Sequence, residues 1–150
     1  MKSKFGAALA VAGSFAIVRC LAGINSTPVV VLAQDDPSNP AYFSEKVKPI
    51  LEANCYRCHG GSNHRGGYNM NTRELMLKGG RNGAAIVNGQ PESSLLVKLV
   101  HYEGPGGPSM PMPPPPKQKL SDRDIAVLEK WIKAGAVTPV EPLIGAPAVP

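Results

Sequence analysis

Residues 52–64, "EANCYRCHGGSNH", contain the chemical feature that decides how the rest of the sequence is interpreted. Cys55 and Cys58 stand three positions apart, and His59 follows at once. A disulfide between these cysteines would close a very small loop and remove little entropy from the unfolded chain. The pair is therefore of little use as a structural cross-link, and it indicates a site of chemistry.

The segment that leads into this cluster, "PAYFSEKVKPILEAN", predicts a helix that runs directly into Cys55. Pro40 suits its first turn, whereas Pro49 is expected to kink or restart it. The apolar residues of this segment follow helical spacing and form one face, made of Phe43, Val47, Ile50 and Leu51.

Two shorter helices are predicted beyond a loop rich in Gly, Asn and His. In "NTRELMLKGG", Asn71 is placed to cap the start and Gly79 to end the helix. In "NGQPESSLLVKLVHY" a helix begins near Pro91. Its buried stripe is expected to consist of Leu95, Leu96, Leu99 and Val100.

The segment "LSDRDIAVLEKWIKAG" is the clearest helix in the sequence. Ser121 is its expected N-cap, Asp124 occupies the capping-box position and Gly135 ends it. The expected inner face consists of Ile125, Leu128, Trp131 and Ile132. Trp131 is expected to pack against Phe43 of the first helix.

Residues 103–118, "EGPGGPSMPMPPPPKQ", predict a stiff extended loop, because prolines lack the backbone donors of a helix or central strand. Strand-like alternation is almost absent elsewhere, so the expected fold class is all-α. The helices are short and the chain has 16 glycines, which limits the apolar area that it can bury. Small domains of this kind usually contain something else that fills the interior.

The first 33 residues have the layout of an export signal. Lys2 and Lys4 precede the apolar run "FGAALAVAGSFAIV", which is short for a membrane-spanning helix. Cleavage is expected after Ala33, with Ala22 as the other candidate, and a retained anchor is the alternative. The predicted organisation is a signal peptide over 1–33, one domain over 34–137 and a Pro-rich flexible tail over 138–150.

The charge of the whole chain overstates that of the mature protein. The chain has 16 Lys and Arg against 11 Asp and Glu, a net charge of +5. Removal of residues 1–33 takes away three basic residues and no acidic one, which leaves a net charge of +2. Because no basic stripe is interleaved with aromatic residues, nucleic acid is not an expected partner.

Residues 55–59, "CYRCH", match the C-x-x-C-H pattern that attaches a c-type haem. Two thiols three positions apart at the end of a helix reach the vinyl groups on adjacent pyrroles of one porphyrin, and His59 directs its imidazole at the iron. Export agrees with this interpretation, because the thioether chemistry takes place outside the cytoplasm. Trp131 is interpreted either as a plain core residue or as a haem contact, and Phe43 and Trp131 are well placed to pack together and clasp the haem.

The cysteine pair also permits a zinc site, a redox dithiol or a structural disulfide. A structural zinc site needs about four ligands, so it would have to recruit His59 and His64 beside the cysteines. A thioredoxin-like redox pair expects a βαβ setting, which this sequence lacks. A purely structural disulfide has the loop-length weakness described above.

A low-spin electron carrier needs a second axial ligand, and the candidates are Met70, Met76, Met110, Met112, His64 and His101. Met112 is preferred because it precedes a proline in a stiff loop, which loses little entropy on ligation. Met110 has a similar setting and, like an open site, remains an alternative. His64 is expected in an exposed loop, His101 at the solvent edge and Met76 in the core.

The order of helix, C-x-x-C-H, methionine loop and terminal helix resembles the class I cytochrome c fold and, more narrowly, the planctomycete-type cytochrome c domain. The stretches that carry the resemblance lie within about residues 43–137: "VKPILEANCYRCHGG", "NTRELMLKGGRNGAAIVNGQPESSLLVKLV", "MPPPPKQKLSD" and "LEKWIKAGA". The resemblance implies three to five short helices wrapped around one covalent haem c. It implies attachment at Cys55 and Cys58, with His59 as proximal and Met112 as distal ligand. Two extra prolines and the second methionine, Met110, depart from the family pattern.

These features predict a mono-haem cytochrome that is periplasmic or otherwise exported and that carries single electrons through an exposed haem edge. Redox proteins are the expected partners, with no small-molecule substrate, and membrane association is expected only if the signal is retained. The protein is not expected to be an enzyme, because no acid–base residue is placed on the methionine side. The alternative function is a haem-based sensor or small-ligand-binding module with an open or displaceable distal site.

Overall fold

The computed structural model describes residues 35–105 and 110–140, and within these ranges the chain is helical. The described residues form no strand, only an isolated bridge between Gly80 and Gly83. The all-α prediction is therefore confirmed. In the described ranges, none of the helices has the length and apolar character needed to cross a bilayer. The predicted signal peptide and most of the predicted tail lie outside the described residues.

The first helix extends from Pro40 to His59 without interruption, five residues beyond the predicted segment. It consists of α2 (Pro40–Tyr42), a π-helical turn η1 (Phe43–Val47), α3 (Lys48–Leu51), a second π-helical turn η2 (Glu52–Tyr56) and α4 (Arg57–His59). The Asn39 side chain caps its start by accepting a hydrogen bond from the Ala41 amide, 2.9 Å away.

The helix does not restart at Pro49, which was one of the two outcomes predicted for this proline. The π-helical turn η1 immediately precedes this proline, and the Lys48 amide donates to the Phe43 carbonyl five residues back. A widened turn gives space to the proline ring and does not require the amide that proline lacks. The first helix is therefore continuous and includes the C-x-x-C-H motif at its end.

The helix α5 (Arg73–Lys78) begins one residue later than predicted. Its N-cap is Thr72, whose hydroxyl accepts from the Leu75 amide at 3.2 Å. The predicted cap, Asn71, instead bonds to both backbone groups of Gly61, at 2.8 and 2.9 Å. Gly79 ends the helix with a φ of 80°, as predicted.

The helix α7 (Asp122–Lys133) follows its prediction closely, whereas α6 (Leu95–His101) does not begin near Pro91, where the prediction placed its start. A 3₁₀ turn, η4 (Pro91–Ser93), leads into α6. At the start of α7, the Ser121 hydroxyl accepts from the Asp124 amide at 3.1 Å. Gly135 follows α7 with a φ of 101°, a conformation that glycine adopts without strain.

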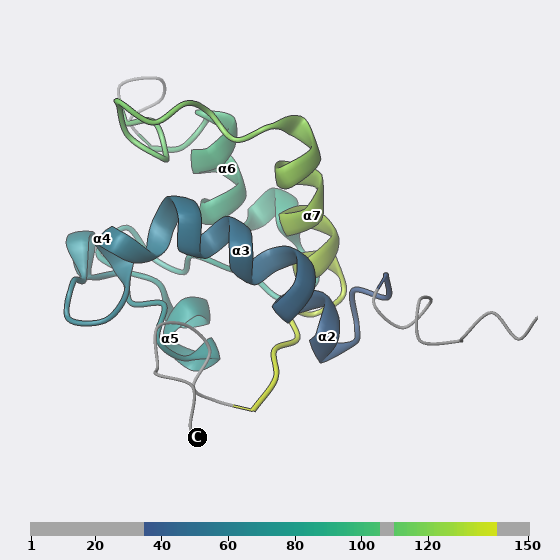
Figure 1. Ribbon diagram of the computed structural model, residues 1–150. Coiled ribbons are helices and arrows are strands. Elements are labelled where there is room, and N and C mark those ends of the chain that lie inside the picture. The colour runs from purple at the N-terminus through teal and green to yellow at the C-terminus, as the bar shows by residue number, and fades with distance from the viewer. Residues whose placement is uncertain (1–34, 106–109, 141–150) are drawn as a thin grey trace, which may run out of the picture.

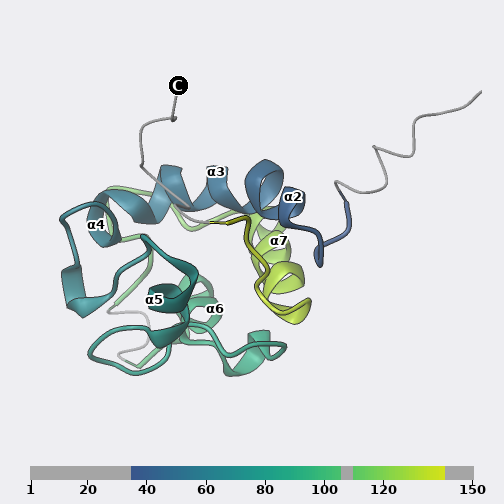
Figure 2. The same cartoon turned by 90° about the horizontal axis from the view of Figure 1, so that it is seen from below.

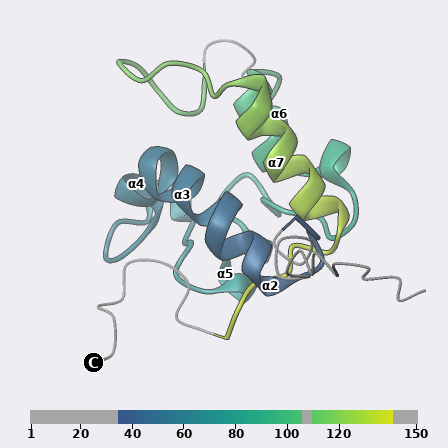
Figure 3. The ribbon, with the colours of Figure 1, turned by 45° about the vertical axis from the view of Figure 1, so that its right-hand side comes forward.

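The first helix crosses the molecule, with α6 and α7 along one side and α5 on another (Figure 1). Figure 2 shows α5 and α6 together below the first helix in that view, and Figure 3 shows α6 and α7 side by side. Contacts of α7 with both α6 and the η1 turn hold this arrangement together. The Pro-rich loop connects α6 to α7 and lies on the same side of the molecule as the end of α6.

One hydrophobic core joins all these helices. It contains the predicted pair of Phe43 and Trp131, whose ring centroids are 5.5 Å apart with the planes tilted by 44°. The Trp131 indole also donates to the Val137 carbonyl at 2.7 Å. The buried side chains of the cluster are Tyr42, Phe43, Val47, Leu51, Met70, Met76, Ile86, Leu96, Val97, Val100, Leu120, Ile125, Leu128, Trp131, Ile132 and Ala136.

Candidate cofactor site

A cavity of about 370 Å³ lies between the end of the first helix, helix α6 and the loops around them. This volume falls within the range of small-molecule and cofactor sites, about 300–1,000 Å³. The cavity brings together residues from 54–59, 65–70, 80–85, 95–100 and 110–114. Several of these residues are exposed, among them Arg65, Arg81 and Pro114, so the cavity reaches the molecular surface.

The cysteines and the histidine of the C-x-x-C-H motif all line this cavity. Cys55 lies in η2, and Cys58 and His59 lie in α4. Positions three and four residues apart share one face of a helix, so the helical conformation alone directs the three side chains to the same side. Gly60 ends the first helix with extended backbone, and a Cβ atom there would lie 1.9 Å from the Tyr56 ring.

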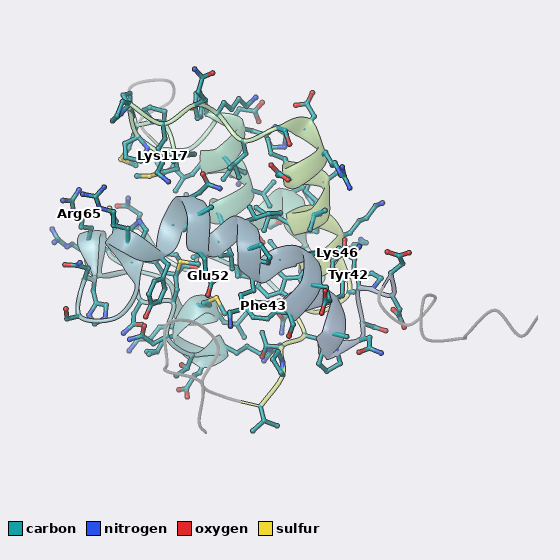
Figure 4. All side chains as sticks on the ribbon, in the orientation of Figure 1. Tyr42, Phe43, Lys46, Glu52, Arg65 and Lys117 are labelled. Carbon is teal, nitrogen blue, oxygen red and sulfur yellow. The ribbon has the colours of Figure 1, made fainter. Side chains whose placement is uncertain are left out.

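Met110 and Met112 line the same cavity from the Pro-rich loop. The Met112 amide donates to the Leu99 carbonyl at 3.4 Å, which places this methionine on the α6 side of the cavity. Lys117, shown above the first helix in Figure 4, donates a hydrogen bond to the Ala53 carbonyl. Both bonds tie the loop to the helices that form the site.

The other predicted ligand candidates occupy different positions. Met70 is fully buried and lines the cavity, while Met76 is buried in the core and does not line it. His64 is exposed, with Nε2 3.0 Å from the Gly61 carbonyl. His101 lies 2.9 Å from the carboxylate of Glu129 at the surface of α7. The predictions for the two histidines and Met76 are therefore confirmed.

The predicted stripe of the α6 helix forms the wall of the cavity. All four of its residues line the cavity, and Leu95 and Leu99 are only half-buried, in contrast to the predicted burial. Leu96 and Val100 of the stripe are buried in the core cluster, together with Val97, which the predicted stripe omitted. The prediction differed from the structure because an apolar cavity and an apolar core both select hydrophobic side chains at the helix positions that face them.

The chemistry of the cysteine pair argues against a redox dithiol. Both cysteines are free thiols. Burial raises the pKa of Cys55 to about 11, partly opposed by the nearby Lys117 ammonium. A reactive redox cysteine has a lowered pKa, so this shift is in the opposite direction.

The imidazole of His59 is in an environment that favours its neutral form. Burial lowers the pKa of His59, and the backbone groups of Arg65 and Tyr68 partly oppose this effect. The Nδ1 atom of His59 is buried and makes no hydrogen bond, although these backbone groups lie close to the ring. A neutral imidazole is the form that ligates a metal.

Tyr68 supplies a second buried polar atom without a partner. Its ring lies 5.2 Å from the His59 ring, and its hydroxyl makes no hydrogen bond. Burial, reinforced by Cys55, raises the pKa of Tyr68 well above its usual range, so the hydroxyl keeps its proton. Because an unpaired buried hydroxyl is costly, the group is suited to a ligand with an acceptor.

The donor set and the shape of the site fit a c-type haem. Two thiols and an imidazole lie on one helical face, two thioethers lie in a loop on the α6 side, and apolar side chains form the wall between them. Phe43 and Trp131 do not line the cavity, so the expectation that they clasp the haem is wrong. They pack together in the core, where they support the helices that form the site.

The cavity residues that sequence reasoning missed include Arg65, Tyr68 and Arg81. Each lies in a loop rich in glycine or asparagine, where helical and strand periodicity carry no information. Tyr68 is the lone aromatic residue between His59 and Asn71. A single aromatic residue in a polar loop was the sequence feature that could have indicated a role at the site.

The zinc alternative gains no support from the described residues. In the part of the chain that the structure describes, no group of three or more His, Cys, Asp or Glu side chains is arranged to hold a metal ion. His64, which that alternative required, does not line the cavity with His59.

The comparison with protein families agrees with the geometry of the site. Residues 55–116 match the family described as planctomycete cytochrome C. The matched stretch begins at Cys55 and includes His59 and Met112. The matched residues are therefore similar to the haem-binding cytochrome c class. More narrowly, the chain contains a planctomycete-type cytochrome c domain, which confirms the resemblance. No curated protein and no solved structure matched the chain.

Proposed function

We propose that this protein is an exported mono-haem c-type cytochrome that carries single electrons. The observation that carries the proposal is the meeting of Cys55, Cys58, His59 and Met112 at one apolar cavity. These residues come from two distant segments of the chain and supply the two thiols, the imidazole and the thioether of such a site.

In this proposal the first helix holds the cofactor in place. Cys55 and Cys58 would form the thioether bonds, and His59 would bind the iron from the same helical face. Bound haem would supply an iron that changes its oxidation state by one electron. The rigid helix keeps the imidazole in position in both oxidation states, so little reorganisation accompanies the transfer.

Met112 is the proposed second iron ligand. Its backbone is anchored to Leu99 by the 3.4 Å hydrogen bond, and the prolines around it restrict the loop. A restricted loop loses less entropy when its thioether is held at the iron. Ligation by histidine and methionine raises the reduction potential relative to two histidines.

The protein is proposed to transfer electrons by contact with redox partners and not to transform a substrate. The cavity reaches the surface beside exposed residues, which supports an accessible haem edge. With a net charge of +2 after loss of residues 1–33, two haem propionates would nearly neutralise the molecule. Long-range steering would then be weak, and docking would depend on local groups around the edge.

Export is proposed from the signal-like pattern of residues 1–33, and the periplasm or an equivalent compartment is the proposed location. The test is expression in a host competent in cytochrome maturation, followed by fractionation. A mature N-terminus at Gln34 in the periplasmic fraction is the expected result. Full-length protein in the cytoplasm or the membrane would contradict it.

Absorption spectra of the purified protein, oxidised and reduced, test the carrier function. The expected result is a six-coordinate low-spin spectrum with the far-red sulfur-to-ferric-iron band. Carbon monoxide is then expected to bind the reduced protein slowly or hardly at all. Rapid and complete carbon monoxide binding would overturn the carrier proposal and favour the ligand-binding alternative.

A further inference from the structure

Two arginines line the candidate haem cavity in addition to the residues that hold the cofactor. Arg65 and Arg81 come from separate loops, and both are exposed. The residues of α6 that line the same cavity are aliphatic. The cavity therefore has an apolar wall along this helix and a cationic rim where the two loops reach the solvent.

Backbone contacts fix the two loops side by side. The Arg81 amide donates to the Gly66 carbonyl at 2.8 Å. A Cβ atom at Gly80 would lie 2.6 Å from that same carbonyl, so a side chain is excluded at the point of contact. Arg65 directly precedes Gly66, and Arg81 directly follows Gly80, so this packing brings the two arginines to one rim of the cavity. Figure 4 shows Arg65 beside the end of the first helix.

Neither guanidinium is neutralised by the protein within the described residues. The ion pairs there are Lys46 with Asp35, Lys48 with Glu52 and His101 with Glu129, and none of them involves Arg65 or Arg81. Arginine stays charged at any working pH, and its fork of donors matches a carboxylate in a bidentate manner. Two such groups at one rim form a site for an anion with one or two carboxylates.

The buried Tyr68 hydroxyl independently indicates that the occupant of the cavity carries a polar group. This hydroxyl is a donor without a partner. An occupant with apolar atoms alone would leave it unsatisfied, at a cost of about 1–3 kcal/mol.

We propose that Arg65 and Arg81 bind the carboxylate groups of the cofactor and keep them ionised beside the iron. This inference depends on the proposed function, since the porphyrin of a c-type haem carries two propionates. The arginines act as positioning and tuning residues. Their positive charge favours the reduced iron, which carries one positive charge fewer, and so raises the reduction potential.

The experiment uses the purified holoprotein with Arg65→Gln, Arg81→Gln and the double substitution. The matched control is Arg57→Gln, because Arg57 is exposed, lies within the C-x-x-C-H motif and does not line the cavity. Redox titration at neutral pH gives the potential. Resonance Raman spectroscopy reports the bending vibration of the propionates, which responds to their hydrogen bonds and not to general stability.

Each single substitution is expected to lower the potential and shift the propionate band, and the double substitution is expected to do so more strongly. Arg57→Gln is expected to leave the propionate band in place. Arg65→Lys, which keeps the charge without the fork, is expected to recover part of the potential. A propionate band and potential in the double variant equal to those of Arg57→Gln would overturn the inference. In that outcome the covalently bound pigment would leave the proposed function intact. A wild-type protein that is purified without pigment would refute both proposals.

Discussion

The two segments that supply the proposed iron ligands differ in how the chain builds them. His59 lies in a continuous helix, and its neighbours Cys55 and Cys58 reach the cavity because of helical spacing alone. Met112 lies in a loop without helix or strand, and tertiary bonds to Leu99 and from Lys117 hold that loop in place. Local structure therefore determines the first side of the site, and long-range packing determines the second.

This difference predicts an unequal response to mutation. A substitution of His59 in the helical segment should prevent normal iron binding, because the same helix offers no other imidazole at this position. A change in the loop should be milder, because the two thiols and the imidazole of the helical segment would still hold the cofactor.

The largest effect is expected from His59→Ala. Loss of the imidazole removes the ligand fixed by the helix, so no stable low-spin species should form. Absorption and electron paramagnetic resonance spectra of the ferric protein check this result. The matched control is His64→Ala, since His64 is exposed and outside the cavity. An unchanged low-spin spectrum in His59→Ala would remove this residue from the iron.

Met112→Ala is expected to have the next largest effect. The far-red sulfur-to-iron band should disappear and the reduction potential should fall, because the thioether stabilises ferrous iron. Met110→Ala is the control and should keep both properties. If the two variants exchange these outcomes, Met110 is the ligand and the preference for Met112 is wrong.

Gly60→Ala tests how tightly the helical segment is packed. A Cβ atom would lie 1.9 Å from the Tyr56 ring, and overpacking of this kind costs about 1–3 kcal/mol. Denaturant unfolding of the holoprotein should show this loss of free energy with the low-spin spectrum retained before unfolding. A midpoint equal to that of the wild type would indicate that the ring moves freely.

Pro114→Ala is expected to have the smallest effect. Pro114 is exposed, and its replacement mainly increases the conformational freedom of the unfolded chain. The expected loss of unfolding free energy is about 0.4–1 kcal/mol, smaller than for Gly60→Ala. The same denaturant measurement checks this order. A loss larger than that of Gly60→Ala would mean that the loop is packed as tightly as the helix.

The sequence predicted those parts of the structure that depend on short-range periodicity and motif spacing. The capped helix after Ser121 and the face shared by Cys55 and Cys58 were available from helical spacing. The same spacing placed Phe43 and Trp131 on the inner faces of their helices, from which their contact was inferred. The sequence did not predict that the helix continues through Pro49. The helix accommodates this proline by means of a π-helical turn, and no known residue pattern predicts such a turn.

The remaining features depend on contacts between distant segments. Hydrophobic periodicity could not distinguish whether Leu95 faces the core or a cavity, since both environments select apolar side chains. Asn71 was a reasonable helix cap in the sequence, but its side chain makes two hydrogen bonds to the Gly61 backbone and does not cap the helix. Arg65 and Arg81 meet at one rim only because two glycine-rich loops pack backbone to backbone.

Intact mass spectrometry of the mature protein, produced in a host competent in cytochrome maturation, tests the central claim most directly. The account predicts a polypeptide heavier by one haem, with a pigment that acid–acetone extraction leaves attached and a Cys55→Ala, Cys58→Ala double variant that loses it. The mass of the bare polypeptide, or a pigment that the extraction removes, would contradict the account.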